Sequence, residues 1–269
     1  MAIVDAQIHL WTGDTAPPHH WRNPYRIEDA VADMQTAGVD AAINHPPFWD
    51  KDCDSYAAEA ARTHPDKFAT LGWFPFDEHA NPETLHAWLE KPGMLGLRFI
   101  IAVPQIDAAI RAGQLDWLWS MANDREIPMG LFAMPAQLDL VGALADRFPK
   151  MRILLDHMSV PHDRKIPSAI EHFDALAELS RYANIAIKAS AVPSMATDAF
   201  PFVSTHNSLK KLFDAFGAQR LFWGSDYTRL KCDWRDCVVL FTEQLPWLKG
   251  RDLDLVMGEA VCNWTGWNR

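Results

Sequence analysis

The stretch RILLDH at residues 152–157 sets three apolar side chains in succession and then ends in an acid and an imidazole. A strand with one face in water alternates apolar and polar residues, whereas an uninterrupted apolar run is typical of a strand covered on both faces. The stretch LFWGSD at residues 221–226 repeats this arrangement. Strands of this kind belong to parallel sheets, so both stretches favour an α/β fold.

Outward from these two stretches, β-rich runs alternate with helical runs along the whole chain. The predicted strands are residues 3–10, 40–44, 68–74, 95–101, 129–134, 152–157, 185–189 and 220–225. The predicted helices are residues 27–38, 55–63, 82–89, 115–125, 136–148, 168–182, 206–216, 236–245 and 253–264. No linker or low-complexity tract divides these units. We therefore predict a single-domain (β/α)8 TIM barrel over residues 1–269.

The composition narrows the class of protein. The chain has 25 basic and 35 acidic side chains, a net charge of 25 − 35 = −10, and 49% hydrophobic residues. The apolar content excludes a disordered chain, and the acidic balance argues against a nucleic-acid partner. The N-terminal residues do not resemble a secretory signal, and no apolar run approaches the length of a membrane span. We therefore expect a cytoplasmic protein with no membrane partner.

Polar residues stand at the ends of three predicted strands. His9 ends the first strand, His157 the sixth and Asp226 the eighth. In a barrel of parallel strands, the chemistry sits where the carboxyl ends of the strands meet. Any one of these residues alone is more often structural, but all three together predict a catalytic site. Period-two alternation also puts Gln7 on the same side of its strand as His9.

These strand ends carry a resemblance to a known family. DAQIHLW at residues 5–11, LDHM at 155–158 and FWGSD at 222–226 resemble the amidohydrolase superfamily, in its amidohydrolase-related family 2. The most similar branch holds 2-pyrone-4,6-dicarboxylate lactonase and the sugar lactonases. The resemblance covers nearly the whole chain. It implies a TIM-barrel hydrolase that opens a lactone or a related cyclic ester or amide.

The resemblance leaves the cofactor open, because Gln7 replaces the first histidine of the family's usual His-x-His. A carboxamide is a poorer zinc ligand than a neutral imidazole. The fourth strand end offers Arg98, which cannot bridge two metals, so a binuclear centre is not expected. Either one divalent metal, zinc or manganese, is held by His9, His157 and Asp226, or the site is metal-free. The resembled pyrone lactonase branch implies that hydrolysis needs no metal.

Chemistry suggests the role of each strand-end residue. Asp226 is the predicted general base, provided that burial raises its pKa or a metal acidifies the water. His9 and His157 would polarise the carbonyl directly or through one metal. The alternative function is a metal-dependent decarboxylase or hydratase that acts on an unsaturated or aromatic carboxylic acid. A catalytically inactive ligand-binding barrel is a third hypothesis.

Six further side chains are predicted to bind the substrate: Arg98, Gln7, Trp73, His45, Lys188 and Arg229. The planar fork of Arg98 suits a carboxylate, although pairing with a nearby acid is the equal alternative. Several of the 12 tryptophans fall near strand exits, where they would wall a pocket for a flat ring. We therefore expect a small cyclic substrate that carries a carboxylate. A homodimer is left open, and the long loop 12–26 is predicted to act as a lid.

Overall fold

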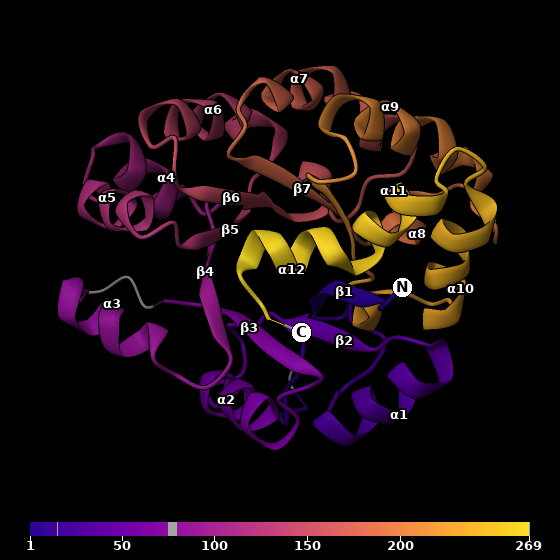
Figure 1. Ribbon diagram of the computed structural model, residues 1–269, viewed down its shortest axis with the longest axis horizontal. Coiled ribbons are helices and arrows are strands. Elements are labelled where there is room, and N and C mark those ends of the chain that lie inside the picture. Colours follow the sequence, from indigo (N-terminus) through magenta and orange to yellow (C-terminus); the bar gives the residue numbers. More distant parts are fainter. Residues whose placement is uncertain (15, 75–79, 269) are drawn as a thin grey trace.

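Eight parallel strands form one sheet in chain order, which confirms the predicted TIM barrel (Figure 1). The computed structural model describes residues 1–14, 16–74 and 80–268. The strands are β1 (Val4–Ile8), β2 (Ala41–Asn44), β3 (Phe68–Gly72), β4 (Met94–Ile100), β5 (Pro128–Phe132), β6 (Arg152–Leu155), β7 (Ile185–Ala189) and β8 (Leu221–Trp223). Every predicted strand is present, although most end earlier than predicted because the last residues turn into the loops.

Helices follow the strands and cover the outside of the barrel (Figure 1). They are α1 (Ile27–Ala37), α2 (Cys53–Thr63), α3 (Pro82–Leu89), α4 (Pro104–Arg111), α5 (Asp116–Asp124), α6 (Leu138–Arg147), α7 (Phe173–Glu178), α8 (Val192–Met195), α9 (His206–Phe216), α10 (Trp234–Val239), α11 (Gly250–Asp254) and α12 (Ala260–Thr265). The short helices α4 and α8 were not predicted. The predicted helix 168–182 is instead the six-residue α7 between two 3-10 turns.

The apolar runs that predicted buried strands are buried in the structure. Ile153, Leu154 and Leu155 are each fully inaccessible to solvent, so both faces of β6 are covered. At the opposite end of the barrel from the strand exits, α12 crosses the opening (Figure 1) and contacts β1 and β8. Just before α12, the backbone at Gly258 packs closely against the start of the chain, where a Cβ on residue 258 would lie only 2.7 Å from the carbonyl oxygen of Ala2. Within the described ranges, no helix is both long and apolar enough to span a bilayer. Cytoplasmic location remains a prediction.

The barrel closes where β8 meets β1, at a seam held largely by one carboxylate. The Asp226 backbone N–H donates to the Gln7 carbonyl at 2.8 Å. Asp5 Oδ1 accepts the backbone N–H groups of Gln7 and Ser225, both at 2.9 Å, and Oδ2 accepts the indole N–H of Trp234 at 2.8 Å. Burial raises the pKa of Asp5 to about 6, against these hydrogen bonds. Asp5 thus supplies acceptors that the short β8 strand lacks.

Replacement of this carboxylate is expected to weaken the seam. Asp5→Asn keeps Oδ1 but turns an NH2 group towards the Trp234 indole N–H, leaving a buried donor unpaired. We expect the free energy of unfolding to fall by about 1–3 kcal/mol, the scale of one buried unsatisfied group. Urea denaturation at about pH 8, where Asp5 is ionised, measures this.

The matched control is Asp40→Asn. Asp40 accepts the Ile3 N–H at 2.7 Å at an exposed position beside the same strand. Its loss should cost less than about 0.5 kcal/mol, as surface changes usually do. Equal stability of the two variants would contradict the role given to Asp5.

Candidate active site

The ends of β1, β6 and β8 bring His9, His157 and Asp226 to one cavity of about 330 Å³. His9 Nε2 lies 3.2 Å from Asp226 Oδ1, and His157 Nε2 lies 3.7 Å from Asp226 Oδ2. The three residues that the strand-end pattern singled out are therefore adjacent in space. All three side chains are buried, and Asp226 is fully inaccessible to solvent.

Two sharp backbone turns aim these side chains at the cavity. His157 lies two residues after the end of β6 and Asp226 three residues after the end of β8. Their φ values are 50° and 54°, in the left-handed region. Side chains other than glycine rarely adopt this conformation, and it recurs at functional sites. Because the chain turns at once, the imidazole and the carboxylate face the barrel mouth instead of continuing the strand.

Asp226 is ionised in this environment. Burial by itself would raise the pKa of its carboxyl, but Arg229, His157 and His9 together hold the pKa well below its usual range. The Arg229 guanidinium donates to Asp226 Oδ2 at 3.1 Å, and its side chain is only 7% exposed. Two routes to a general base were considered from the sequence, a pKa raised by burial and a water acidified by a metal. The first route does not apply, because the pKa of Asp226 is lowered.

The imidazoles are anchored through their other nitrogens. His9 Nδ1 donates to the backbone carbonyl of His45 at 2.5 Å, which leaves Nε2 facing the cavity. His157 Nδ1 lies 2.8 Å from the Ser190 hydroxyl. Burial lowers the pKa of His157 to about 3, so this ring is neutral at ordinary pH. Both rings are thus held with Nε2 towards Asp226.

Aromatic side chains and further imidazoles wall the cavity. Its lining includes Phe132, His162, His20, Trp49 and Phe48. His162 stacks on Phe132 with ring centroids 5.1 Å apart and planes 7° from parallel. Burial lowers the pKa of His162 to about 4 and that of His20 to about 3, so both rings are neutral. His162 was missed from the sequence; its one signal is that it follows His157 by five residues on the same rim loop.

The other predicted substrate residues lie at different depths. Arg98 and Arg229 line the cavity. Trp73 is half-buried outside this lining, with its ring centroid 6.1 Å from that of Phe48. Gln7, His45 and Lys188 are fully buried and bond to one another or to backbone. Contact of Trp73 and these three residues with substrate stays a prediction.

A buried ion-pair cluster links the fully buried Lys188 to Arg98, which lines the cavity. Asp156 Oδ2 accepts from Arg98 Nε at 2.7 Å, and Asp156 Oδ1 lies 2.6 Å from Lys188 Nζ. The pairing of Arg98 with an acid, considered from the sequence as its alternative, is therefore present. Burial opposes the charge on Asp156, but Lys188 and Arg98 hold its pKa well below its usual range. Burial lowers the pKa of Lys188, which Asp156 counters.

The loop predicted as a lid, described except for residue 15, covers the cavity. Pro17, His19 and His20 belong to the lining. His20 Nδ1 lies 2.9 Å from the Thr228 hydroxyl, and the Trp21 N–H donates to the Thr228 carbonyl at 2.7 Å. These bonds fasten the loop to the segment that carries Asp226 and Arg229. Movement as a lid remains a prediction.

The donor set fits a resident metal poorly. Among the described residues there is no group of three His, Cys, Asp or Glu side chains arranged to hold a metal ion. His9, His157 and Asp226 converge, but Arg229 already binds the carboxylate, and Gln7 Oε1 lies 2.5 Å from the Lys188 ammonium. The guanidinium and the ammonium thus donate to oxygens whose lone pairs would otherwise be offered to a metal.

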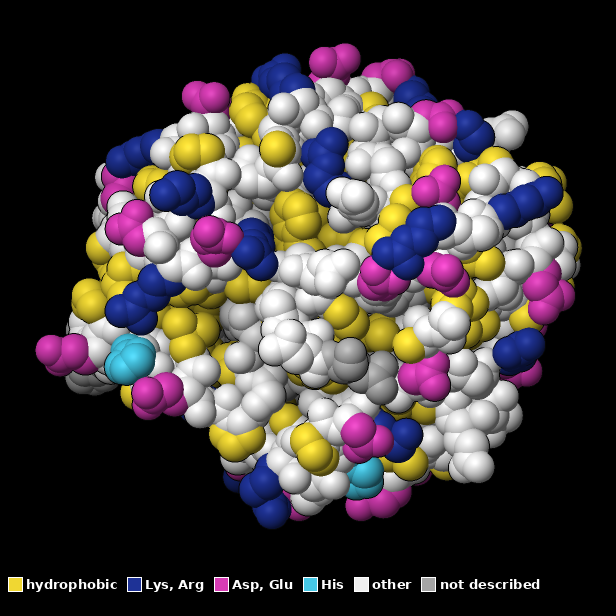
Figure 2. Space-filling view, in the orientation of Figure 1, with side chains coloured by type: hydrophobic (Ala, Val, Ile, Leu, Met, Phe, Trp, Pro, Cys, Tyr) yellow, Lys and Arg dark blue, Asp and Glu magenta, His cyan; other side chains and the backbone are white. Residues whose placement is uncertain are grey.

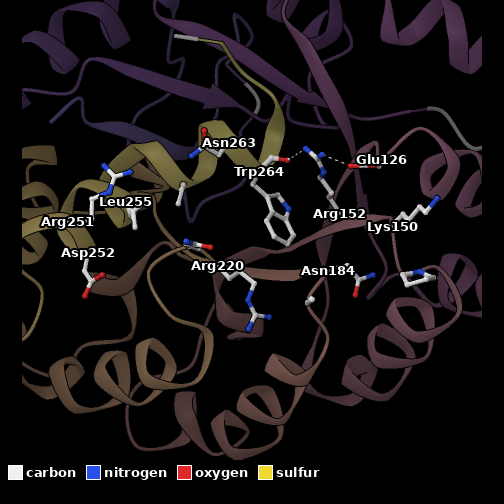
Figure 3. A pocket seen from close by; sticks show the side chains of 14 residues that line it. Glu126, Lys150, Arg152, Asn184, Arg220, Arg251, Asp252, Leu255, Asn263 and Trp264 are labelled. Atoms are coloured by element: carbon white, nitrogen blue, oxygen red, sulfur yellow. Dashed lines mark hydrogen bonds and ion pairs between the residues drawn. The ribbon is translucent and has the colours of Figure 1, made fainter.

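A larger hollow of about 960 Å³ lies at the opposite end of the barrel, near the strand starts (Figure 3). Arg152 at the start of β6 binds Glu126 at 2.6 Å and the Trp264 carbonyl at 3.1 Å there. Figure 2 shows this face, where basic and acidic side chains are interspersed. None of the strand-end catalytic candidates lines this hollow. The smaller cavity is therefore the candidate active site.

This chain is similar to known proteins in both sequence and fold. The family model described as amidohydrolase matches residues 4–253. A curated L-fucono-1,5-lactonase of Burkholderia ambifaria is 23% identical over 231 residues, which cover 83% of this chain and 79% of the relative.

Solved structures show the same fold. A zinc-bound amidohydrolase from Burkholderia multivorans is 19% identical, covers 99% of both chains and has a TM-score of 0.83. A candidate 2-pyrone-4,6-dicarboxylic acid hydrolase from Pseudomonas putida is 17% identical, with a TM-score of 0.79, and the match covers 100% of this chain and 98% of the other.

Proposed function

Because this chain belongs to the amidohydrolase family, we propose that it is a lactonase that opens a cyclic ester by attack of water. The observation that carries the proposal is the buried, ionised Asp226 carboxylate, which faces the cavity beside His9 and His157. The similarity to a curated L-fucono-1,5-lactonase supports the same reaction class.

In the proposed reaction, Asp226 accepts a proton from water as the water oxygen attacks the lactone carbonyl carbon. His157 polarises the carbonyl oxygen through Nε2–H, with the Ser190 hydroxyl donating to Nδ1 at 2.8 Å. His9 Nε2, 3.2 Å from Asp226, shares the proton. The ring C–O bond then breaks, and the leaving oxygen takes that proton. Asp226 acts in this proposal with neither a pKa raised by burial nor a metal that acidifies the water, so it is a weak base, which favours a reactive ester over an amide.

The lining also supports a substrate class. Arg98 and Arg229 outnumber the single acid of the lining, Asp226, which suits a substrate with a carboxylate. The stacked pair of Phe132 and His162 offers a flat wall for a ring. We propose a small cyclic ester that carries at least one carboxylate. The predicted decarboxylase or hydratase remains the alternative function. It would need a metal, and His9, His157 and Asp226 are poorly arranged to bind one, because Arg229 already binds Asp226.

An assay of ring opening tests the proposed function. Purified protein is incubated with five- and six-membered lactones, with and without a carboxylate, and acid release is followed with a pH indicator. We expect turnover of a carboxylate-bearing lactone without release of carbon dioxide. Carbon dioxide release from an unsaturated or aromatic acid would support the alternative, and inactivity on every lactone would overturn the proposal.

Removal of the carboxylate charge is the sharpest single change. Asp226→Asn is nearly isosteric, and we expect it to lower kcat by at least about 100-fold, the scale of a lost general base. Circular dichroism and thermal unfolding check that the variant folds. A folded variant with turnover near that of the wild type would remove Asp226 from the mechanism. The matched control is Asp236→Asn on α10, outside the cavity lining, with unchanged kcat.

The depressed pKa of Asp226 makes a prediction about pH. Below its folded-state pKa the base is protonated and activity is lost, so the acid limb of kcat/KM lies below the ordinary carboxyl value. We expect kcat/KM to stay level from about pH 8 down to about pH 5. A pH–rate profile measures this, with circular dichroism at each pH as the control. An acid limb centred near neutral pH would assign the base to another group.

The poor fit to a metal predicts insensitivity to chelators. After dialysis against EDTA and 1,10-phenanthroline, we expect kcat to stay within about twofold of the untreated value, because the chain supplies its own cations. Plasma mass spectrometry follows the metal content before and after dialysis. Loss of activity that added zinc or manganese restores would show a metal-dependent enzyme and strengthen the decarboxylase alternative.

A further inference from the structure

The ammonium group of Lys188 is buried inside the barrel, below the candidate active site. Lys188 Nζ lies 2.5 Å from Gln7 Oε1, 2.6 Å from Asp156 Oδ1 and 3.2 Å from His45 Nε2. The four side chains come from β7, β1, the end of β6 and the loop directly after β2, and none is accessible to solvent. A lysine ammonium has three donors and no acceptor, so Gln7 and Asp156 present oxygen lone pairs to it. His45 Nε2 also lies 3.1 Å from the Ala6 carbonyl oxygen, and it can bond to only one of these two partners.

This requirement orients the amide of Gln7. Because the ammonium can only donate, the Gln7 atom 2.5 Å from it is the accepting Oε1, and the NH2 group is turned towards His9. Gln7 Nε2 then lies 3.4 Å from His9 Nε2, the ring nitrogen that also faces Asp226. Without the ammonium, the two ends of the amide would have no reason to keep this order.

The same cation also fixes an arginine of the cavity. Lys188 binds one oxygen of Asp156, and the other oxygen accepts from Arg98 Nε at 2.7 Å. Among the described residues, Arg98 donates a hydrogen bond only to Asp156, so the position of Asp156 sets the direction of the guanidinium. The terminal nitrogens of Arg98 stay available to the cavity that it lines. Lys188 therefore acts on both the proton-transfer side and the substrate-anchoring side of the site.

We propose that Lys188 is a positioning residue. Its buried ammonium orients Gln7 towards His9 and, through Asp156, holds Arg98 towards the substrate. The expected effect of Lys188 on turnover rests on the proposed lactonase reaction. Its expected effect on the positions of Gln7 and Arg98 does not. Lys188 is fully buried and outside the cavity lining, so in this role it acts through its neighbours. The two effects can therefore be tested separately.

Crystal structures of Lys188→Met give the test that needs no substrate. Methionine matches the length of the stem but carries no charge. We expect the Gln7 amide to turn over or the Arg98 guanidinium to move by more than about 0.5 Å, the tolerance of a precise site. Unmoved Gln7 and Arg98 side chains would overturn the proposal, whether or not any lactone is hydrolysed. Inactivity of the wild-type protein would remove only the lactonase proposal.

Kinetics then separate positioning from simple stability. We expect Lys188→Met to lower kcat about 100-fold, as expected of catalytic groups misplaced by about 1 Å. If Lys188 acts through Gln7, Lys188→Met combined with Gln7→Leu should lower kcat no more than about threefold beyond Lys188→Met. Losses that multiply would overturn the route through Gln7.

Asn184→Ala is the matched stability control. Asn184 is also buried and donates to the carbonyls of Ala145, Phe148 and Met151, at the end of the barrel away from the cavity. We expect it to lower the midpoint of thermal unfolding but to leave kcat unchanged. A comparable fall in kcat would mean that general destabilisation explains Lys188→Met.

A second variant covers the case in which Lys188→Met does not fold. Gln7→Glu keeps an oxygen for the ammonium and should fold, but its carboxylate has no N–H to offer His9. We expect kcat to fall at least about tenfold, with thermal unfolding near that of the wild type. Unchanged kcat would overturn the role given to the Gln7 amide and thus to Lys188.

Discussion

The seam between the last strand and the first is the constraint on which this barrel depends. The short β8 strand leaves donors unpaired, and the buried Asp5 carboxylate accepts from Ser225, Trp234 and Gln7 to close the gap. Gln7 and His9 stand on one side of the seam and Asp226 on the other, where its N–H binds the Gln7 carbonyl. Closing the fold and assembling the candidate site are therefore one structural event.

The fold was accessible from sequence because its strongest signal is local. Runs such as Ile153–Leu155 are typical of strands covered on both faces, and eight predicted strands in even alternation with helices leave few architectures. The helix α8 was not predicted because it has only four residues, and α4 was not predicted because Ile110 is its one buried residue, which leaves little apolar pattern. The continuous helix predicted over 168–182 gave way to α7 and two 3-10 turns, whose shape depends on packing against neighbouring segments.

The candidate site was only partly accessible from sequence. Strand ends predicted that His9, His157 and Asp226 would meet, because parallel strands share one exit. Alternation along a strand says that a side chain points inward, but not whether it reaches the cavity or stops below it. Lys188 and His45 point inward and stop below, bonded to partners that only the closed barrel supplies. His162 reaches the cavity through a loop whose path no periodicity reveals.

The arginines of the cavity have a consequence for turnover. Opening a lactone turns a neutral ester into a carboxylate, so the product carries one more negative charge than the substrate. Arg98 and Arg229, which would attract an anionic substrate, would hold the ring-opened acid still more strongly. With the loop that carries His20 fastened across the mouth to Thr228, escape would also require this cover to loosen. Such an enzyme would be slowed by its own accumulating product, and departure of that product, more than bond breaking, would set the pace.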